Sequence, residues 1–440
     1  MHPIQAKGPS AAAPSPVPRL TASSDSSPRA KRQHRPNRPH RPNRPHQPDR
    51  PDPAADAVDA DVAGAVGGAL EQVLADRLAR AGALDALFAV ELAGRVARFT
   101  REGGKRTRSQ LLWWSMRACG GGDGPTVAAT LRIGAALELL QTCALVHDDL
   151  MDGSALRRGR PTLHADLRDR YAGSAPADRT ARFGEASAVL AGDLALAWAD
   201  DVVSETPLGP AAATVRRVWS DMRTEMVAGQ FLDLQGQLTG SRSRPQALRA
   251  AHLKSALYSV QRPLALGAAM AGADGRTTRA LCSAGRCVGM AFQLRDDLDD
   301  VFGDPHLTGK SCGDDIRNGK PTYLAALALA RAEAAADRPA KTVLERALGD
   351  EDLTPAGLDG VRDVLVRTGA RQAVEEKIAR LSARGLRHFD GALADSVAKS
   401  RLRGLLTAAT ASRATDGPPD RVRPAPAAPP EGSAAPETRR

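Results

Sequence analysis

The sequence predicts an all-α protein with one large helical domain, and two observations support this fold class. Apolar residues recur at positions i, i+3, i+4 and i+7 through long stretches, of which VAATLRIGAALELLQTCALVHDDLM at 127–151 is a clear example. Residues 60–410 are also rich in Ala and Leu, which favour helices, and the alternation typical of strands is scarce. Because no linker interrupts this region, we expect one domain and not several.

The two ends of the chain differ in composition from the middle. Residues 1–54 are rich in Pro, Ser, Arg and His and contain a six-residue repeat, HRPNRP twice and then HQPDRP. Proline at every third position excludes a helix or a central strand, so this segment is expected to be extended and disordered. Residues 413–440, which include PAPAAPPEGSAAP, are also expected to be disordered. The predicted folded domain is therefore 55–412.

Most of the positive charge belongs to the N-terminal extension. Residues 1–54 contain ten Lys or Arg and three Asp, which is +7 of the +10 that the whole chain carries. A further +1 belongs to 413–440, so about +2 remains for the folded domain. The pI near 9.8 thus describes the extension, and we expect no nucleic acid as a partner of the domain. The composition does not identify a partner for the extension.

Nothing in the sequence resembles a targeting segment or a disulfide framework. The N-terminus lacks the apolar region of a secretory signal, and no run of 18 uncharged apolar residues occurs. Five cysteines show neither a CxxC motif nor a zinc-ligand spacing, and we expect them to be reduced. These features predict a cytoplasmic protein.

Two acidic runs, each followed by basic residues, carry the strongest functional signal. The first, HDDLMDGSALRRGRPT, contains Asp148, Asp149 and Asp152. The second begins FQLRDDLDD and repeats the DDxxD spacing. Its residues are Asp296, Asp297 and Asp300, and Lys310 and Lys320 follow.

The DDxxD spacing predicts a metal-assisted diphosphate site. On a helix, positions i, i+1 and i+4 bring three carboxylates to one face, where they repel one another unless a cation lies between them. Mg²⁺ suits such a site because it takes one or two carboxylates, several waters and substrate phosphates as ligands. A single acidic stripe is usually a solvated helix face. Here both runs follow strongly apolar helical segments, where unpaired charge is costly, so solvation alone does not explain them.

Several further motifs occur in a fixed order around the acidic runs. They are GGKRTR at 103–108, ELLQ at 138–141, GQFLDL at 229–234 and KSALY at 254–258. Together with the acidic runs, these motifs resemble those of the trans-isoprenyl diphosphate synthases, the polyprenyl synthetase family, and most of all its geranylgeranyl diphosphate synthases. The resemblance covers roughly residues 60–410.

The resemblance implies a fold and a reaction. The fold is a helical bundle of the isoprenoid synthase type with a central active-site cavity. The reaction is the head-to-tail condensation of isopentenyl diphosphate with an allylic diphosphate, assisted by three Mg²⁺ ions. Family members are usually homodimers, so the resemblance also implies a homodimer.

The resemblance also assigns roles to individual residues, by the motif positions that they occupy. The implied metal ligands are Asp148, Asp152, Asp296 and Asp300, with Asp149 and Asp297 in support. The allylic diphosphate and its metals are assigned to Arg157, Gln230, Asp233, Lys254, Lys310 and Lys320. Isopentenyl diphosphate is assigned to Lys105, Arg108, Gln141 and Arg158. Stabilisation of the allylic cation is assigned to Ser255 and Gln293.

Some residues near these motifs receive only structural roles. Tyr258 shares a helix face with Lys254 and is expected to pack. Glu138, Asp193 and Asp315 are expected to be structural partners of nearby groups. Ser109 stands where family members usually have proline, and we expect this difference to alter only the start of a helix.

Two small residues upstream of the first acidic run predict the product length. Cys143 and Ala144 lie five and four positions before Asp148, on the helix expected to form one wall of the product tunnel. Family members that stop at fifteen carbons typically have aromatic residues at these positions. We therefore predict a C20 product, geranylgeranyl diphosphate, with Leu140 or Leu137 about one turn deeper as the floor. A C15 product or a chain of C25–C30 or longer is the alternative.

Two other classes of function use related features. A class I terpene cyclase also carries DDxxD, but its second metal motif differs and it needs no second diphosphate grip. A noncatalytic scaffold subunit would tolerate loss of the motif charges, and in this sequence no motif Asp, Lys or Arg is missing.

Deleting residues 1–54 should leave the catalytic constants within a few-fold and the thermal midpoint nearly unchanged, because a disordered extension adds nothing to a packed core. Steady-state kinetics and thermal melts of the truncated and full chains check this. Loss of the fold or of catalysis on truncation would show that the extension belongs to the domain.

Overall fold

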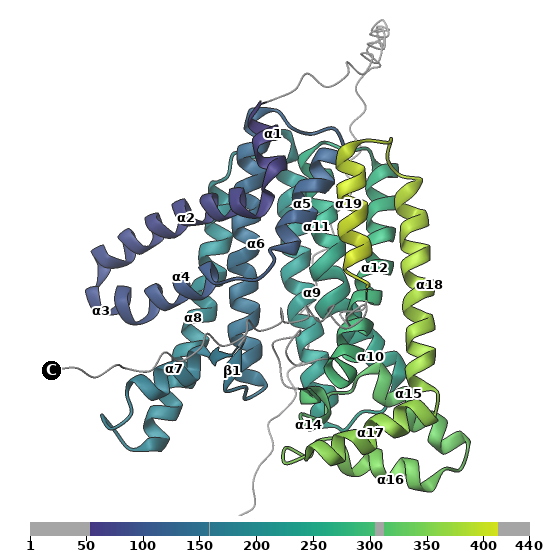
Figure 1. Ribbon diagram of the computed structural model, residues 1–440. Coiled ribbons are helices and arrows are strands. Elements are labelled where there is room, and N and C mark those ends of the chain that lie inside the picture. The colour runs from purple at the N-terminus through teal and green to yellow at the C-terminus, as the bar shows by residue number, and fades with distance from the viewer. Residues whose placement is uncertain (1–52, 158, 304–311, 412–440) are drawn as a thin grey trace, which may run out of the picture. The chain divides into compact units, whose positions relative to one another are not determined.

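The computed structural model describes residues 53–411, apart from 158 and 304–311. The C-terminal tail and all but the last two residues of the N-terminal extension therefore lie outside the described residues. Almost all of the described chain is helical (Figure 1), which confirms the predicted all-α fold class. The first helix begins at Pro53, two residues before the predicted domain boundary.

The elements follow one another with short connections and keep the labels of Figure 1. The first half of the described chain contains α1 (Pro53–Ala60), α2 (Val62–Leu84), α3 (Ala86–Phe88), η1 (Ala89–Ala93), α4 (Gly94–Arg101), α5 (Thr107–Ala118), α6 (Gly124–Met151), β1 (Leu156–Arg157), β2 (Arg160–Pro161), α7 (Leu163–Arg170) and α8 (Ala177–Glu205). The second half contains η2 (Gly209–Ala211), α9 (Ala212–Leu238), α10 (Arg244–Ala251), η3 (His252–Gln261), α11 (Arg262–Met270), α12 (Gly275–Phe302), α14 (Asp314–Arg317), α15 (Tyr323–Ala334), α16 (Arg338–Ala347), α17 (Pro355–Arg367), α18 (Ala370–Asp390) and α19 (Val397–Ala408).

The long helices α6 and α12 end at the two acidic runs. Each starts at an aspartate cap: Asp123 accepts a hydrogen bond from Thr126 N, and Asp274 accepts one from Thr277 N. The carboxylates of both runs consequently lie in the last turns of these helices, where unpaired carbonyl groups already give the helix a partial negative charge. Local structure therefore increases the need for cations at both ends.

The core consists of two hydrophobic clusters that share α12. The larger cluster contains α6, which packs on α5 and α8, and the half of α12 that includes Leu281 and Val288. The smaller cluster lies around the other half of α12, with Leu294 and Leu298, and is formed by α14 to α18. The half of α12 that carries the second acidic run therefore packs against the smaller hydrophobic cluster.

Helix α6 is long and apolar enough to cross a membrane by length and composition, alone among the helices of the described ranges. However, 72% of its most apolar window is buried inside the fold. A core helix of a folded domain has this pattern, so the hydropathy of α6 follows from its central position.

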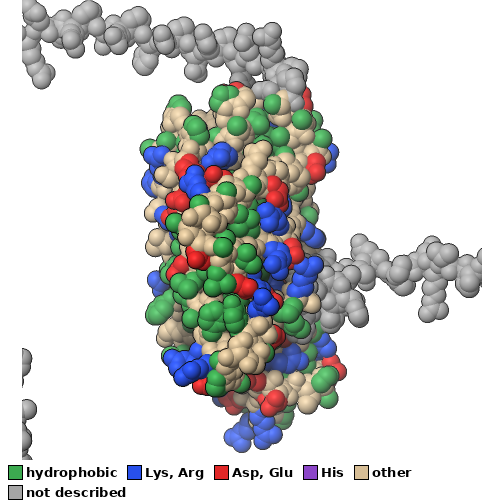
Figure 2. Space-filling model, turned by 90° about the vertical axis from the view of Figure 1, so that its left-hand side faces the viewer, with side chains coloured by type: hydrophobic (Ala, Val, Ile, Leu, Met, Phe, Trp, Pro, Cys, Tyr) green, Lys and Arg blue, Asp and Glu red, His purple; other side chains and the backbone are tan. Residues whose placement is uncertain are grey.

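Helices α2, α3 and α4 form an arm that projects from the bundle (Figure 1). The end of this arm exposes large apolar side chains: Leu84, Leu87 and Val90 are 82%, 67% and 67% exposed. Figure 2 views this side of the molecule, and apolar side chains gather there between patches of both charges. Such a surface is typical of a protein interface.

Glycine allows a close helix contact next to the acidic residues. A Cβ atom on Gly229 of α9 would lie 2.3 Å from the backbone nitrogen of Lys254, which belongs to η3. Gly289 of α12 approaches the carbonyl oxygen of Ala256 in the same way, at 2.5 Å. Because backbone cannot move aside cheaply, these two glycines fix the position of η3 between α9 and α12.

Gly229→Ala should destabilise the fold by about 1–3 kcal/mol, because the added methyl group forces α9 and η3 apart. Gly68→Ala is the matched control. Gly68 lies in the exposed interior of α2 with no atom within 4 Å of its Cβ position. This control should gain about 0.5–1 kcal/mol from lower backbone entropy of the unfolded chain. Urea unfolding of both variants checks the prediction, and equal stabilities for the two would contradict it.

Candidate active site

A cavity of about 520 Å³ separates the ends of α6 and α12. Its walls come from α5, α6, β1, α9, α10, η3, α12 and the segment 315–323. The predicted site residues on this wall are Arg108, Gln141, Cys143, Ala144, Asp148, Arg157, Gln230, Asp233, Lys254, Ser255, Gln293, Asp296, Asp297, Asp300 and Lys320. Residues from all six motifs therefore surround one space.

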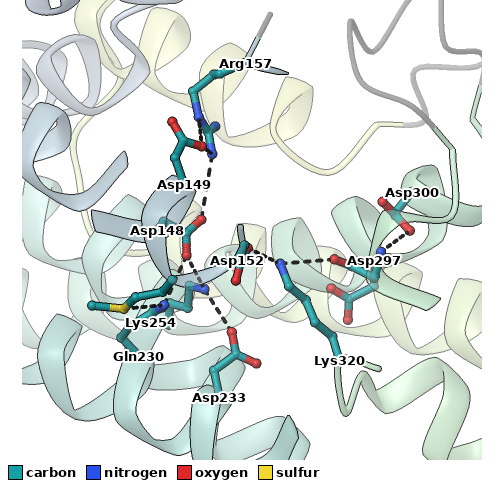
Figure 3. A network of polar contacts seen from close by, with 12 residues as sticks. Asp148, Asp149, Asp152, Arg157, Gln230, Asp233, Lys254, Asp297, Asp300 and Lys320 are labelled. Carbon is teal, nitrogen blue, oxygen red and sulfur yellow. Dashed lines mark hydrogen bonds and ion pairs between the residues drawn. The ribbon is translucent and has the colours of Figure 1, made fainter. Parts of the chain in front are cut away.

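Lys254 joins the first acidic run to α9 (Figure 3). Its ammonium group lies 2.9 Å from a carboxylate oxygen of Asp148 and 2.9 Å from one of Asp233. Gln230, one helical turn before Asp233, also donates to Asp148 at 3.2 Å. Although burial opposes the charged forms, the ion pairs prevail, so the pKa of Asp148 is lowered and that of Lys254 is raised.

Lys320 joins the first acidic run to the segment that follows the second one. Its ammonium group donates to Asp152 at 2.8 Å and lies 3.4 Å from a carboxylate oxygen of Asp315. Burial disfavours its charge, but Asp315 and Asp152 hold the pKa of Lys320 well above its usual value. Lys320 thus remains charged between two acidic groups (Figure 3).

Arg157 neutralises the most buried carboxylate of the first run. The short hairpin of β1 and β2 follows α6 directly and places the Arg157 Nε atom 2.5 Å from Asp149. The Asp149 side chain is 1% exposed, and burial raises the pKa of Asp149 to about 6 despite Arg157. Asp149 therefore lies behind the run, paired with Arg157, while Asp148 lines the cavity.

The second acidic run is held by its own helix and by the next segment. Asp297 is buried and accepts a hydrogen bond from Gln293 at 2.7 Å, and burial followed by the charge of Asp315 raises the pKa of Asp297 well above its usual value. Asp300 accepts a hydrogen bond from the backbone N–H of Asp315 at 3.1 Å. Asp296 lines the cavity one turn from this support.

The acidic end of the cavity suits a hard divalent cation. Two buried carboxylate oxygens, Oδ2 of Asp149 and Oδ1 of Asp152, have no hydrogen-bond partner in the described part of the chain. The available donors are carboxylate oxygens, which Mg²⁺ prefers. Among the same residues, no three acidic, histidine or cysteine side chains are close enough to hold an ion by themselves. This arrangement fits Mg²⁺, which completes its shell with water and phosphate oxygens.

The other side of the cavity is basic and aromatic. The Arg108 guanidinium group lies 4.6 Å from the ring centre of Tyr258 and donates to Ser259 at 2.9 Å. Tyr258 in turn donates its hydroxyl hydrogen bond to Gln141 at 2.9 Å. The signal for Tyr258 in the sequence is its position four residues after Lys254, which indicated packing only.

Three predicted diphosphate residues do not contribute to the described cavity wall. Lys105 is exposed and absent from the wall, because it lies in the open loop before α5. Arg158 and Lys310 lie outside the described residues.

The structure corrects the expectation that Ser109 alters only a helix start. Its side chain is fully buried, and its hydroxyl group lies within hydrogen-bond distance of two acceptors on α6, Glu138 at 2.6 Å and Gly134 O at 3.0 Å. Ser109 therefore ties the basic segment at the start of α5 to the helix that carries Gln141 and Asp148. A proline could not make these contacts.

The predicted product-length residues divide into two groups. Cys143 and Ala144 line the cavity, whereas Leu140 is fully buried in the hydrophobic core and does not. The expected position of Leu140 as the tunnel floor is therefore wrong for this cavity. His147 also lies on the wall, 3.8 Å from the Cys143 sulfur. Burial raises the pKa of the Cys143 thiol to about 12, so this residue contributes shape and not reactivity.

Comparison with known proteins identifies the family of this chain. A family model described as polyprenyl synthetase matches residues 91–356. Farnesyl diphosphate synthase of Geobacillus stearothermophilus is 36% identical over 239 residues, which cover 52% of this chain and 73% of that protein. Geranylgeranyl pyrophosphate synthase 3 of Arabidopsis thaliana, a chloroplastic protein, is 32% identical over 256 residues, or 56% of this chain and 66% of that one.

A solved structure extends the similarity to the whole fold. Geranylgeranyl pyrophosphate synthase from Corynebacterium glutamicum, complexed with isoprenyl diphosphate and magnesium, superposes with a TM-score of 0.74. It is 36% identical and covers 78% of this chain and 97% of its own. Since the family model spans more than half of the sequence, the chain belongs to the polyprenyl synthetase family, and it is a prenyltransferase of the trans-prenyl diphosphate synthase type.

Proposed function

We propose that this chain condenses isopentenyl diphosphate head-to-tail with an allylic diphosphate, in the presence of Mg²⁺, to give the C20 all-trans product geranylgeranyl diphosphate. The observation that carries the proposal is that carboxylates of both DDxxD motifs and two lysines line a single cavity. One of these lysines, Lys320, also donates to Asp152 of the first motif (Figure 3). A diphosphate group carries about three negative charges before the reaction and gains one more when its bond to the allylic carbon breaks. Clustered cations in this cavity would stabilise that charge.

The acidic end would hold the cations and the allylic diphosphate. Bound Mg²⁺, which we expect as three ions, supplies Lewis-acid stabilisation of the leaving diphosphate. Its ligands would be Asp148, Asp152 and Asp296, with Asp300 behind them. Lys254 donates to Asp148 and Lys320 donates to Asp152, while Arg157 lies 3.8 Å from Asp148. All three cations would donate to the diphosphate oxygens.

The middle of the cavity would protect the allylic cation. Ser255 and Gln293 lie on its wall and present oxygen atoms that are too weakly basic to react with a carbocation. Because Gln293 donates its amide N–H to Asp297, its oxygen is free to face the cation. The departing diphosphate is the nearest strong acceptor and would take the proton that completes the reaction.

The basic side of the cavity would hold isopentenyl diphosphate without metal. Arg108 and Gln141 lie there, and Lys105 precedes them in the open loop. A class I terpene cyclase acts on one diphosphate and would need no such second grip. A noncatalytic scaffold would need no diphosphate site at all. Both alternatives therefore leave Arg108 and Gln141 without a function.

Small residues on the α6 wall support a product longer than C15. Cys143 and Ala144 line the cavity and leave room where an aromatic ring would block it. Relatives with both farnesyl and geranylgeranyl names match this chain, so the product length rests on these two side chains.

Two further expectations stay predictions. A homodimer is supported by the exposed apolar residues Leu84, Leu87 and Val90 on the arm, which light scattering of the purified protein can test. The cytoplasmic location is expected from the sequence, and the arrangement of the cavity residues does not bear on it.

Asp148→Ala and Asp296→Ala should each lower turnover by several orders of magnitude, because loss of one ligand disturbs every ion that shares the diphosphate. The measurement is elongation of an allylic primer at saturating Mg²⁺. Chelation of the metal by EDTA should abolish activity in the wild type, and added Mg²⁺ should restore it.

The matched control for these variants is Asp363→Ala. Asp363 is exposed on α17 and does not line the cavity, so this variant should keep wild-type turnover. If either site variant retains more than about a tenth of the wild-type rate, that residue is not a metal ligand.

Cys143→Phe should shift the product from C20 toward C15, since an aromatic ring on the wall shortens the cavity. Cys143→Ala, which removes volume at the same position, should not shorten the product. Chromatography of the dephosphorylated products distinguishes these outcomes. A wild type that stops at C15, or a Phe variant with unchanged products, would exclude this wall as the determinant of length.

A further inference from the structure

Tyr258 lies at the centre of the basic side of the cavity, although its sequence position indicated only packing. It belongs to η3, a π-helical segment, and is 3% exposed. π-Helical turns are rare and often occur at functional sites. Its hydroxyl group contacts Gln141 and its ring contacts Arg108, and the proposed function assigns both of these residues to isopentenyl diphosphate.

The hydroxyl group determines which end of the Gln141 amide faces the cavity. It donates to the Gln141 Oε1 atom at 2.9 Å, so the carbonyl end of the amide is engaged. The remaining end is the NH₂ group, which has two donors and no acceptor. An anion in the cavity would therefore meet a hydrogen-bond donor. If the amide turned over, the anion would meet a carbonyl oxygen instead.

The ring and the next residue hold Arg108. The guanidinium group lies 4.6 Å from the Tyr258 ring centre, a distance at which the negative face of the ring attracts a cation. Ser259 fixes the same group by accepting a hydrogen bond from Nη2 at 2.9 Å. Arg108 is thereby restricted to one orientation beside Gln141, with other N–H groups left for an anion.

We propose that Tyr258 is a positioning residue for isopentenyl diphosphate: it orients the Gln141 amide and the Arg108 guanidinium group so that both present N–H donors to the metal-free diphosphate. The inference rests on the proposed function. It assigns Tyr258 to one substrate only, because its contacts are with Gln141 and Arg108 and not with the lysines at the acidic end.

The test is Tyr258→Phe, which removes the hydroxyl group and keeps the ring. The KM for isopentenyl diphosphate should rise about fivefold to tenfold, because one oriented hydrogen bond is lost. The kcat and the KM for the allylic diphosphate should stay within about twofold of wild type. Calorimetric titration with isopentenyl diphosphate alone, without an allylic primer, should show the same loss of affinity.

Two controls separate positioning from a general structural effect. Tyr171→Phe removes the same atom from a tyrosine that does not line the cavity, and should change neither KM. In a Gln141→Ala background, Tyr258→Phe should have a much smaller effect than in the wild type, because it would then act only through Arg108. Ser259→Ala tests the Arg108 contact separately and should also raise the KM for isopentenyl diphosphate alone.

The inference is overturned if Tyr258→Phe leaves the KM for isopentenyl diphosphate unchanged, or raises both KM values equally. It is also overturned if the increase in KM for isopentenyl diphosphate in the double variant equals the product of the increases in the Tyr258→Phe and Gln141→Ala single variants. A wild type that neither binds nor consumes isopentenyl diphosphate would overturn the proposed function and this inference together. A wild type that consumes it, beside an unaffected Phe variant, would overturn this inference alone.

Discussion

Carboxylate repulsion at the ends of two core helices is the constraint on which the rest of the site depends. The acidic runs end α6 and α12, where the helix dipoles add negative charge and burial reduces screening by water. Such groups stay ionised only beside cations. Lys254 and Lys320 meet this need within the chain, and each pairs a carboxylate of the first run with one from another element. The same geometry would hold the proposed metal–diphosphate complex.

The cavity separates two kinds of charge recognition. At the acidic end, cations and anions alternate, which suits a diphosphate that brings metal with it and leaves as an ion. On the opposite side, Arg108 and Gln141 offer N–H donors beside the aromatic ring of Tyr258, which suits a diphosphate that binds without metal and does not leave. The apolar α6 wall between them, with Cys143 and Ala144, would exclude water from the proposed carbocation. One cavity thus has the three environments that chain elongation needs.

Much of this arrangement follows from sequence patterns, and the remainder depends on packing between distant elements. The helical period predicted the all-α class, and the DDxxD spacing predicted carboxylates such as Asp148 and Asp296 on a common wall. The roles of Ser109 and Tyr258 were not predicted, because each depends on a contact with α6 from a segment far away in the sequence. Leu140 was expected at the cavity but lies in the core, because helical spacing alone does not determine which of the two a side chain faces.

Binding of inorganic diphosphate tests the central claim most directly, because it needs no turnover and no assumption about product length. Titration calorimetry should detect diphosphate binding in Mg²⁺ and little binding in EDTA, since the carboxylates repel an anion that arrives without metal. By linkage, diphosphate should also tighten the binding of Mg²⁺. Equal diphosphate affinity with and without Mg²⁺ would contradict the claim that the two acidic runs bind diphosphate through shared cations.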